Sequence, residues 1–165
     1  MIKINFRDSV AIVGLGYVGL PLALEFGKKF QTIGFDLSSE KVEACNQSLD
    51  INGELDTEEF QKSIYFEATN DAKRLQEADF VIIAVPTPVD EHNVPDFSAL
   101  ILASEIVGVN LKRGATVIYE STVFPGATEE ICLPVLISMS GFDLGNGLSL
   151  GYSPERINPG DKTHV

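Results

Sequence analysis

A glycine-rich turn and one acid stand in a spacing that indicates nucleotide chemistry. Gly14, Gly16 and Gly19 follow the pattern Gly-x-Gly-x-x-Gly, and Asp36 ends the next apolar run. Gly14 can adopt the positive φ of a tight turn, Gly16 lets the backbone approach a pyrophosphate closely, and Gly19 lets a helix and a strand pack together. The carboxylate of Asp36 can accept hydrogen bonds from the ribose hydroxyls of an adenosine.

The elements around this turn are those that a dinucleotide site needs. The apolar, β-branched run 10–13 predicts a buried strand directly before the turn. Apolar residues at a four-residue step from Val18 to Phe26 predict a helix after it, and run 32–35 predicts a second strand that ends on Asp36. This order is that of a dinucleotide-binding βαβ unit. A purely structural glycine turn is the alternative, and the surrounding elements favour cofactor binding.

The acid also bears on which cofactor is bound. A 2′-phosphate beside Asp36 would face a like charge, and no Arg or Lys follows it before Lys41. We therefore expect NAD rather than NADP. A helix is predicted from Ser38 or Ser39 to about Asn46, which places Lys41 in its first turn, facing the expected ribose position. A solvated surface lysine is the alternative for Lys41.

Composition narrows the class of protein. The chain has 165 residues, of which 44% are hydrophobic, and no apolar run reaches membrane-spanning length. With no secretory signal evident, we expect a soluble cytoplasmic protein with no membrane partner. A net charge of −12 argues against nucleic-acid binding. Cys45 and Cys132 have no metal-ligand spacing around them, so we expect no metal site and two buried free thiols in a reducing compartment.

The rest of the chain alternates predicted strands and helices. The unbroken apolar run 80–85 indicates a strand buried on both faces, as in a parallel sheet. The alternation predicts an α/β fold, with a Rossmann-type doubly wound, mostly parallel sheet and helices on both faces. Further strands are predicted at 63–68, 115–119 and 148–152. Further helices are predicted at 57–60, from Asn70 or Asp71 to about 76, from a cap at Asp96 or Ser98 to about 110, and from about 125 to 140.

Two loops leave this sheet at the carboxyl edge, where ligands bind in doubly wound folds. The loop 86–95 is too proline-rich for a helix or a central strand. Its Thr87 is placed to hydrogen-bond a ligand, with satisfaction of its own turn as the alternative. Thr122, in the next loop, is interpreted as a ligand contact and as a cap for the helix that starts near Pro125, two roles that are compatible.

Four stretches of the chain closely resemble the UDP-glucose/GDP-mannose dehydrogenase family, in the same order and over nearly the whole length. They are residues 14–21, 85–88, 119–126 and 151–161. The last stretch resembles the branch that acts on UDP-N-acetylhexosamines, which supplies uronic acids for bacterial capsules and surface polysaccharides. The resemblance implies an oxidoreductase that converts the sugar C6 alcohol to a carboxylate in two steps, using two NAD⁺.

The resemblance also implies roles for individual residues. Glu155 would lie beside the reacting C6 and activate the hydrolytic water, which Thr122 would help to position. Arg156 and Ile157 would meet the UDP-sugar. A carboxylate can take a proton from water, and a hydroxyl can orient it. A charged surface loop is the alternative for Glu155 and Arg156. The residues implied around NAD are Tyr17, Val18, Asp36, Lys41, Thr87 and Thr122.

One feature of the family has no counterpart in the chain. The family's catalytic cysteine, which carries the thioester, lies in a glycine-rich motif far downstream, as do the catalytic lysine and the central helix that forms the dimer. Cys45 and Cys132 match neither place. We therefore expect residues 1–165 to be the amino-terminal NAD-binding domain of a longer enzyme, without the central helix and the UDP-binding domain.

This interpretation carries further expectations and leaves alternatives open. The full-length parent would be a homodimer and the fragment a monomer, and the fragment would bind NAD without turning over sugar. UDP-glucose and GDP-mannose are alternative substrates. A non-catalytic, nucleotide-sensing Rossmann module is an alternative of another class. Thr122 together with Glu155 favours the enzyme, because a sensor needs neither.

Overall fold

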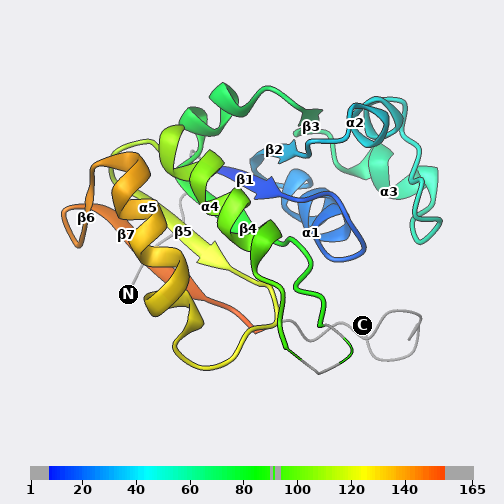
Figure 1. Cartoon of the computed structure of the whole chain (residues 1–165). Helices are drawn as coiled ribbons and strands as arrows, with labels where there is room; N and C mark the ends of the chain where they lie inside the picture. Colours follow the sequence, from blue (N-terminus) through cyan, green and yellow to red (C-terminus); the bar gives the residue numbers. More distant parts are fainter. Residues whose placement is uncertain (1–7, 90, 92–93, 155–165) are drawn as a thin grey trace.

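The computed structural model describes residues 8–89, 91 and 94–154, which build one central sheet (Figure 1). Across the sheet the strands are β3 (Phe66–Thr69), β2 (Gln31–Phe35), β1 (Ser9–Val13), β4 (Phe80–Ile83), β5 (Ala115–Tyr119), β7 (Gly147–Tyr152) and the two-residue β6 (Asp143–Leu144). The pairings from β3 to β7 are all parallel. The order steps outward from β1 and β4 in both directions, which confirms the predicted doubly wound, Rossmann-type fold.

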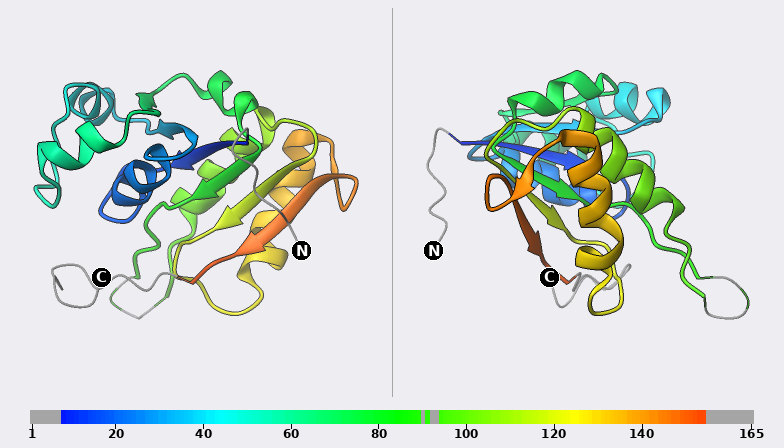
Figure 2. Two further views of the ribbon diagram at one scale, coloured as in Figure 1. Left: turned by 180° about the vertical axis from the view of Figure 1, so that it is seen from behind. Right: turned by 60° about the vertical axis from the view of Figure 1, so that its left-hand side comes forward.

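Helices cover both faces of the sheet. One face carries α1 (Gly19–Gly27), α2 (Ser39–Asn46) and α3 (Thr57–Lys62), which gather over the β1–β3 half (Figure 2). The other face carries the 3₁₀ helix η1 (Ala72–Glu77), α4 (Ser98–Val109) and α5 (Leu133–Ser140), and α4 packs against α5. A π-helical turn, η2 (Thr128–Cys132), leads directly into α5.

Alternation along the strands divides the core in two. In β1, Val10 and Ile12 pack under α1, whereas Ala11 and Val13 pack toward α4 and α5. All four are at most 3% exposed, so the strand is buried on both faces, as its unbroken apolar run predicts. The four residues of β4 are divided between the same two clusters and are also buried.

Parallel pairing aligns the ends of the strands in one row. The last paired residues across the sheet are Thr69, Phe35, Val13, Ile83, Tyr119 and Tyr152. The residues that follow five of these strands extend the ladder, with amide N–H groups that donate to carbonyl oxygens of that row over 2.8 to 3.2 Å. We call these five residues the terminal row, and they are Asp36, Gly14, Ala84, Glu120 and Ser153.

Several element boundaries differ from those predicted. The strand predicted at 63–68 begins only at Phe66, because Ser63 instead closes α3 and donates its hydroxyl to the Leu24 carbonyl at 2.7 Å. The strand predicted at 80–85 ends at Ile83, before the terminal row. The helix after Pro125 starts at Thr128 as a π-turn that ends at Cys132, two residues before Pro134, which lacks the N–H of a regular helix. The strand β6 lies in a segment predicted as loop.

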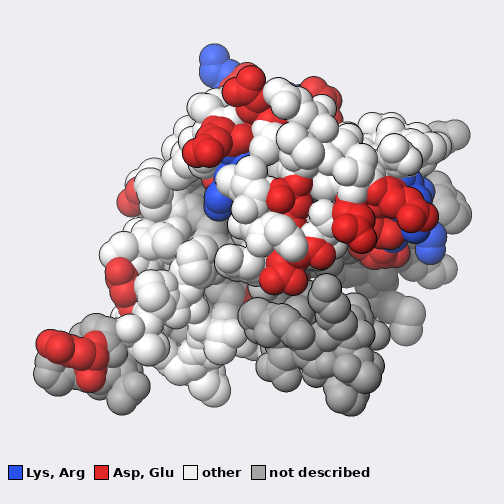
Figure 3. Space-filling view, turned by 90° about the vertical axis from the view of Figure 1, so that its right-hand side faces the viewer, with Lys and Arg blue, Asp and Glu red and all other residues white. Residues whose placement is uncertain are grey.

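Acidic side chains dominate the outer surface of α2, α3 and the loop between them (Figure 3). The nearby lysines are paired, since Lys28 contacts Glu25 and Glu59, and Lys62 contacts Glu58 and Glu59, at 2.6 to 3.0 Å. Within the described ranges, no helix is long and apolar enough to cross a membrane.

Candidate cofactor-binding site

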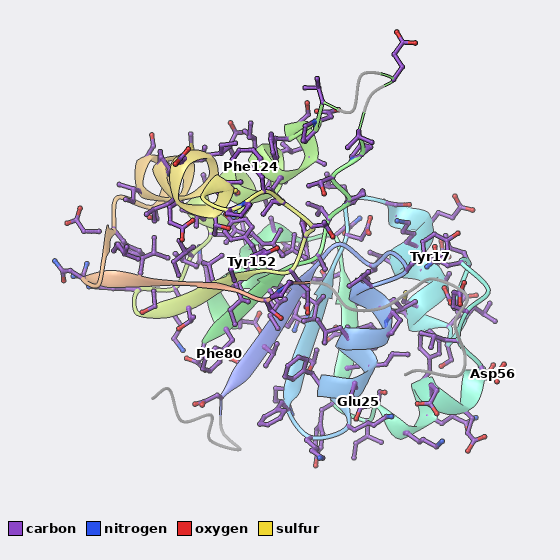
Figure 4. The ribbon with its side chains drawn as sticks, turned by 90° about the horizontal axis from the view of Figure 1, so that it is seen from below. Tyr17, Glu25, Asp56, Phe80, Phe124 and Tyr152 are labelled. Atoms are coloured by element: carbon purple, nitrogen blue, oxygen red, sulfur yellow. The ribbon has the colours of Figure 1, made fainter. Side chains whose placement is uncertain are left out.

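A cavity of about 670 Å³ opens at the carboxyl edge of the sheet, beside the terminal row. A volume of this order suits a nucleotide-sized ligand. In Figure 4, Tyr17, Phe124 and Tyr152 lie toward this edge, whereas Glu25 and Phe80 lie toward the opposite edge. Of the predicted cofactor-binding residues, those that line the cavity are Gly14, Gly16, Tyr17, Val18, Asp36, Lys41, Thr87 and Thr122.

Gly19 does not line the cavity, but it holds the turn that does. Gly14 adopts a φ of +97°, and its N–H donates to the Phe35 carbonyl at 2.8 Å. A Cβ on Gly19 would lie 1.8 Å from the Gly14 carbonyl oxygen, so only glycine lets the start of α1 approach the turn this closely. The predicted roles of these two glycines, a positive φ and close packing, are therefore both met by the geometry.

Gly16 faces open space. A Cβ built on it meets no atom within 4 Å, so the backbone here is bare toward the cavity. Among the described residues, no acceptor is found for the amide N–H groups of Gly16, Tyr17 and Val18. These donors stand at the start of α1, where the helix dipole adds positive potential. The turn can therefore receive an anionic group such as a pyrophosphate.

Asp36 is a shared acceptor rather than a carboxylate open on all sides. Its Oδ2 accepts the N–H of Leu15 at 2.8 Å, and its Oδ1 accepts the N–H of Ser38 at 2.9 Å. Lys41 approaches Oδ2 to 3.5 Å from the first turn of α2, which Ser38 caps as predicted. A carboxylate has about four lone-pair positions, so capacity remains for ribose hydroxyls. Asp36 thus ties the glycine turn to the start of α2.

The loops after β4 and β5 are joined by two hydrogen bonds. Thr87 Oγ1 donates to the Thr122 carbonyl at 2.6 Å, and Ser121 Oγ donates to the Val85 carbonyl at 2.6 Å. The Thr87 hydroxyl therefore donates its hydrogen bond to the neighbouring loop, and its oxygen lone pairs remain available to accept a hydrogen bond from a ligand. The predicted capping role of Thr122 is wrong, because the helix starts six positions later at Thr128 and has no side-chain cap.

The cavity also has polar lining residues that the sequence analysis did not select. Asn52 comes from the loop after α2, where Asp50 accepts the N–H groups of Asn52 and Leu55 at 2.8 and 3.0 Å. Glu120 comes from the terminal row, and Ser153 Oγ donates to its Oε1 at 3.2 Å. A signal for Glu120 was present in the sequence, since it follows a strand just as Asp36 does.

Neither cysteine is placed for chemistry. Cys45 and Cys132 are free thiols, 5% and 0% exposed, in the two halves of the core. Burial raises the pKa of Cys45 to about 11 and also raises the pKa of Cys132. The expected buried thiols are confirmed. Within the described residues, no group of His, Cys, Asp and Glu side chains could hold a metal ion.

We expect both thiols to resist modification in the folded chain. At pH 8 a pKa of about 11 leaves roughly one Cys45 in a thousand as thiolate, the reactive form. A disulfide reagent should therefore titrate no thiol rapidly in buffer and both in denaturant. One rapidly reacting equivalent in buffer would show that a cysteine had been wrongly judged inert.

The predicted residues Glu155, Arg156 and Ile157 lie outside the described residues. Within the described part, the residues present fit a dinucleotide. The turn offers unpaired N–H donors at Gly16 to an anion, and Asp36 stands one strand away for a ribose. Apolar side chains of α4, including Leu102 and Ile106, form a further wall of the cavity.

Comparison with known proteins agrees with this geometry. The model of the UDP-glucose/GDP-mannose dehydrogenase family, NAD binding domain, matches residues 8–164. UDP-N-acetyl-D-glucosamine 6-dehydrogenase of Salmonella typhi is 50% identical over 94% of this chain and 36% of its own length. Protein CapL of Staphylococcus aureus is 51% identical over 95% of this chain and 37% of its own length. The chain thus spans little more than a third of these relatives.

A solved structure supports the same assignment. NDP-N-acetyl-D-galactosaminuronic acid dehydrogenase from Methanosarcina mazei Go1 superposes with a TM-score of 0.82 and 33% identity, over 92% of this chain and 35% of that one. The family match covers nearly all of the described residues, including the glycine turn, Asp36 and both joined loops. This chain belongs to the UDP-glucose/GDP-mannose dehydrogenase family, as an NAD-binding domain.

Proposed function

We propose that this chain is the NAD-binding domain of a nucleotide-sugar 6-dehydrogenase that oxidises the C6 alcohol of a UDP-N-acetylhexosamine to a uronic acid with two NAD⁺. The observation that carries the proposal is the terminal row, which sets the glycine turn and Asp36 side by side at one edge of the cavity. The name of the Salmonella typhi relative, at 50% identity, supports the substrate class, and a role in capsule polysaccharide formation is what the family resemblance implies.

The described residues supply the binding part of this chemistry. When bound, NAD⁺ would accept a hydride from the substrate. The donors of the 16–18 turn would hold the pyrophosphate, Asp36 and Lys41 the adenosine ribose, and the joined loops with Thr87 and Thr122 the opposite end of the cofactor. The two hydrogen bonds that join those loops would help to keep the reacting groups aligned.

The substrate-side roles stay proposals. Glu155 would activate the hydrolytic water, Thr122 would help to position it, and Arg156 with Ile157 would contact the UDP-sugar. The nucleophile would come from another part of a longer, homodimeric and cytoplasmic enzyme, of which residues 1–165 are the amino-terminal domain. Burial of Cys45 and Cys132 supports this view, because neither thiol reaches the cavity.

UDP-glucose and GDP-mannose remain alternative substrates within the same family, whose name includes both. A nucleotide-sensing module is the alternative of another class. The joined loops favour the enzyme, because they bring Thr122 to the cavity that also holds the glycine turn. Steady-state rates of a longer protein that carries this domain, measured with UDP-N-acetylglucosamine, UDP-glucose and GDP-mannose, would separate the three substrates.

The isolated chain tests the domain assignment. We expect it to bind NAD⁺ in a calorimetric titration and to melt cooperatively, because both halves of its core are well buried. We also expect no absorbance of NADH after addition of any of the three nucleotide sugars, since no thiol is accessible. Turnover by this chain alone would overturn the assignment of the nucleophile, and failure to bind NAD⁺ would overturn the proposed function itself.

A further inference from the structure

The loop between α2 and α3 brings one uncharged polar residue to the cavity. Asn52 lies in this loop and lines the cavity, together with Leu37, which comes shortly after β2, and Lys41 of α2. These three are the described lining residues that come from the segment 37–56. Lys41 approaches Asp36 to 3.5 Å, so its charge already has a partner. Asn52 is therefore the residue of this segment whose side chain remains to be explained.

The Asp50 carboxylate holds the backbone of this loop. Its Oδ1 accepts the N–H of Asn52 at 2.8 Å, and its Oδ2 accepts the N–H groups of Glu54 and Leu55 at 2.9 and 3.0 Å. Leu55 packs against the half of the core that lies under α1, which anchors the end of the turn. The position of Asn52 at the cavity is therefore set by the loop itself.

The side-chain amide of Asn52 has no hydrogen-bond partner among the described residues, although the residue is partly buried. A carboxamide offers two N–H donors and one carbonyl acceptor. It can therefore bind a group that presents a donor and an acceptor side by side. The amino group of adenine and the ring nitrogen beside it are such a pair, and Asn binds that edge in a bidentate manner.

Leu37 supplies an apolar surface in the same part of the cavity. Its side chain is 62% exposed in the free chain. An exposed leucine is ordinary by itself, but one that lines a ligand cavity can cover the face of a flat ring. Leu37 directly follows Asp36, the proposed partner of the adenosine ribose. The base attached to that ribose is thus the part of the cofactor that Leu37 and Asn52 would meet.

We propose that Asn52 recognises the adenine base of the cofactor. Its carbonyl oxygen accepts a hydrogen bond from the amino group of adenine, and its amide N–H donates to a neighbouring ring nitrogen, while Leu37 covers the ring. The inference rests on the proposed binding of NAD with its adenosine ribose on Asp36. It gives the site a preference for the base, separate from the discrimination against a 2′-phosphate that is expected from Asp36.

The test compares NAD⁺ with its 1,N6-ethenoadenine analogue in calorimetric titrations of this chain. The etheno bridge joins the amino nitrogen to N1, so it removes the N–H donors and the N1 lone pair while the rest of the cofactor stays the same. Asn52→Leu keeps the branching and approximate size of the side chain and removes both of its polar groups. We expect the unmodified chain to prefer NAD⁺ about ten-fold, and Asn52→Leu to bring the two dissociation constants within about two-fold of each other, through weaker NAD⁺ binding.

Asn146→Leu is the matched control. It makes the same change at an exposed position between β6 and β7, outside the cavity lining, so both dissociation constants should stay within about two-fold. Asn52→Ala repeats the comparison if Asn52→Leu melts below the assay temperature.

Three outcomes would overturn the role of Asn52 and leave the proposed function standing. The unmodified chain could bind both dinucleotides equally, or Asn52→Leu could weaken both alike, as loss of a merely structural residue would. The preference for NAD⁺ could also persist in Asn52→Leu, because a preference set by the bulk of the bridge does not need the amide. If the unmodified chain binds neither dinucleotide, the proposed function itself fails.

Discussion

Gly19→Ala is expected to unfold the glycine turn or to lower the stability of the chain sharply. The new Cβ would lie 1.8 Å from the Gly14 carbonyl oxygen, and this neighbour is backbone, which cannot rotate away as a side chain can. Overpacking a well-packed site lowers the free energy of unfolding by about 1–3 kcal/mol, and a contact this short is expected to cost the upper end of that range or more. For a chain of this size, 1–3 kcal/mol corresponds to a fall in melting temperature of roughly 2–12 °C. Scanning calorimetry measures it directly.

Gly16→Ala supplies the matched control and separates folding from binding. Its Cβ would meet no protein atom within 4 Å, so the melting temperature should change by no more than about a degree. The methyl group would instead stand where the backbone meets the pyrophosphate, and we expect NAD⁺ affinity to fall at least about ten-fold. NAD⁺ binding unchanged in Gly16→Ala would place the phosphates elsewhere. An unchanged melting temperature in Gly19→Ala would contradict the close contact.

The parts of the fold that could be predicted from the sequence are those with local signals. The strand Ala115–Tyr119 has the predicted bounds, because its apolar residues are flanked by a Gly turn and a polar loop. The helix Ser39–Asn46 begins directly after Ser38, one of the two residues predicted to start it. The glycine turn and Asp36 could also be predicted from local signals, because strand, turn and helix follow one another within a short stretch.

The parts that escaped prediction depend on contacts between distant segments. The late start of β3 follows from the Ser63 hydroxyl, which bonds to the Leu24 carbonyl across 39 positions of sequence. The bond from Thr87 to the Thr122 carbonyl spans 35 positions, and it gives Thr122 a place at the cavity instead of a helix cap. Glu120 lies at the cavity edge because strand register aligns the end of β5 with the ends of β1 and β2, and hydrophobic periodicity cannot predict that alignment.

Asp36→Asn is expected to change cofactor selectivity and to cost stability at the same time. The two oxygens of Asp36 accept different backbone N–H groups, those of Leu15 and Ser38. An amide has one acceptor oxygen, so one of these N–H groups would face an NH₂ donor instead. The main chain of Leu15 belongs to a residue only 1% exposed, so we expect a loss of about 1–3 kcal/mol in the free energy of unfolding.

The same substitution removes the negative charge that a 2′-phosphate would face and releases Lys41 from its partner at 3.5 Å. We therefore expect the unmodified chain to bind NAD⁺ more tightly than NADP⁺, and Asp36→Asn to lower that preference at least about ten-fold, through weaker NAD⁺ and stronger NADP⁺ binding.

Glu40→Gln is the control for Asp36→Asn, since it removes an equal charge from an exposed position in the first turn of α2. Calorimetric titration of both cofactors decides the matter. Equal or tighter binding of NADP⁺ by the unmodified chain would mean that Asp36, occupied by Leu15, Ser38 and Lys41, organises the turn without selecting the cofactor.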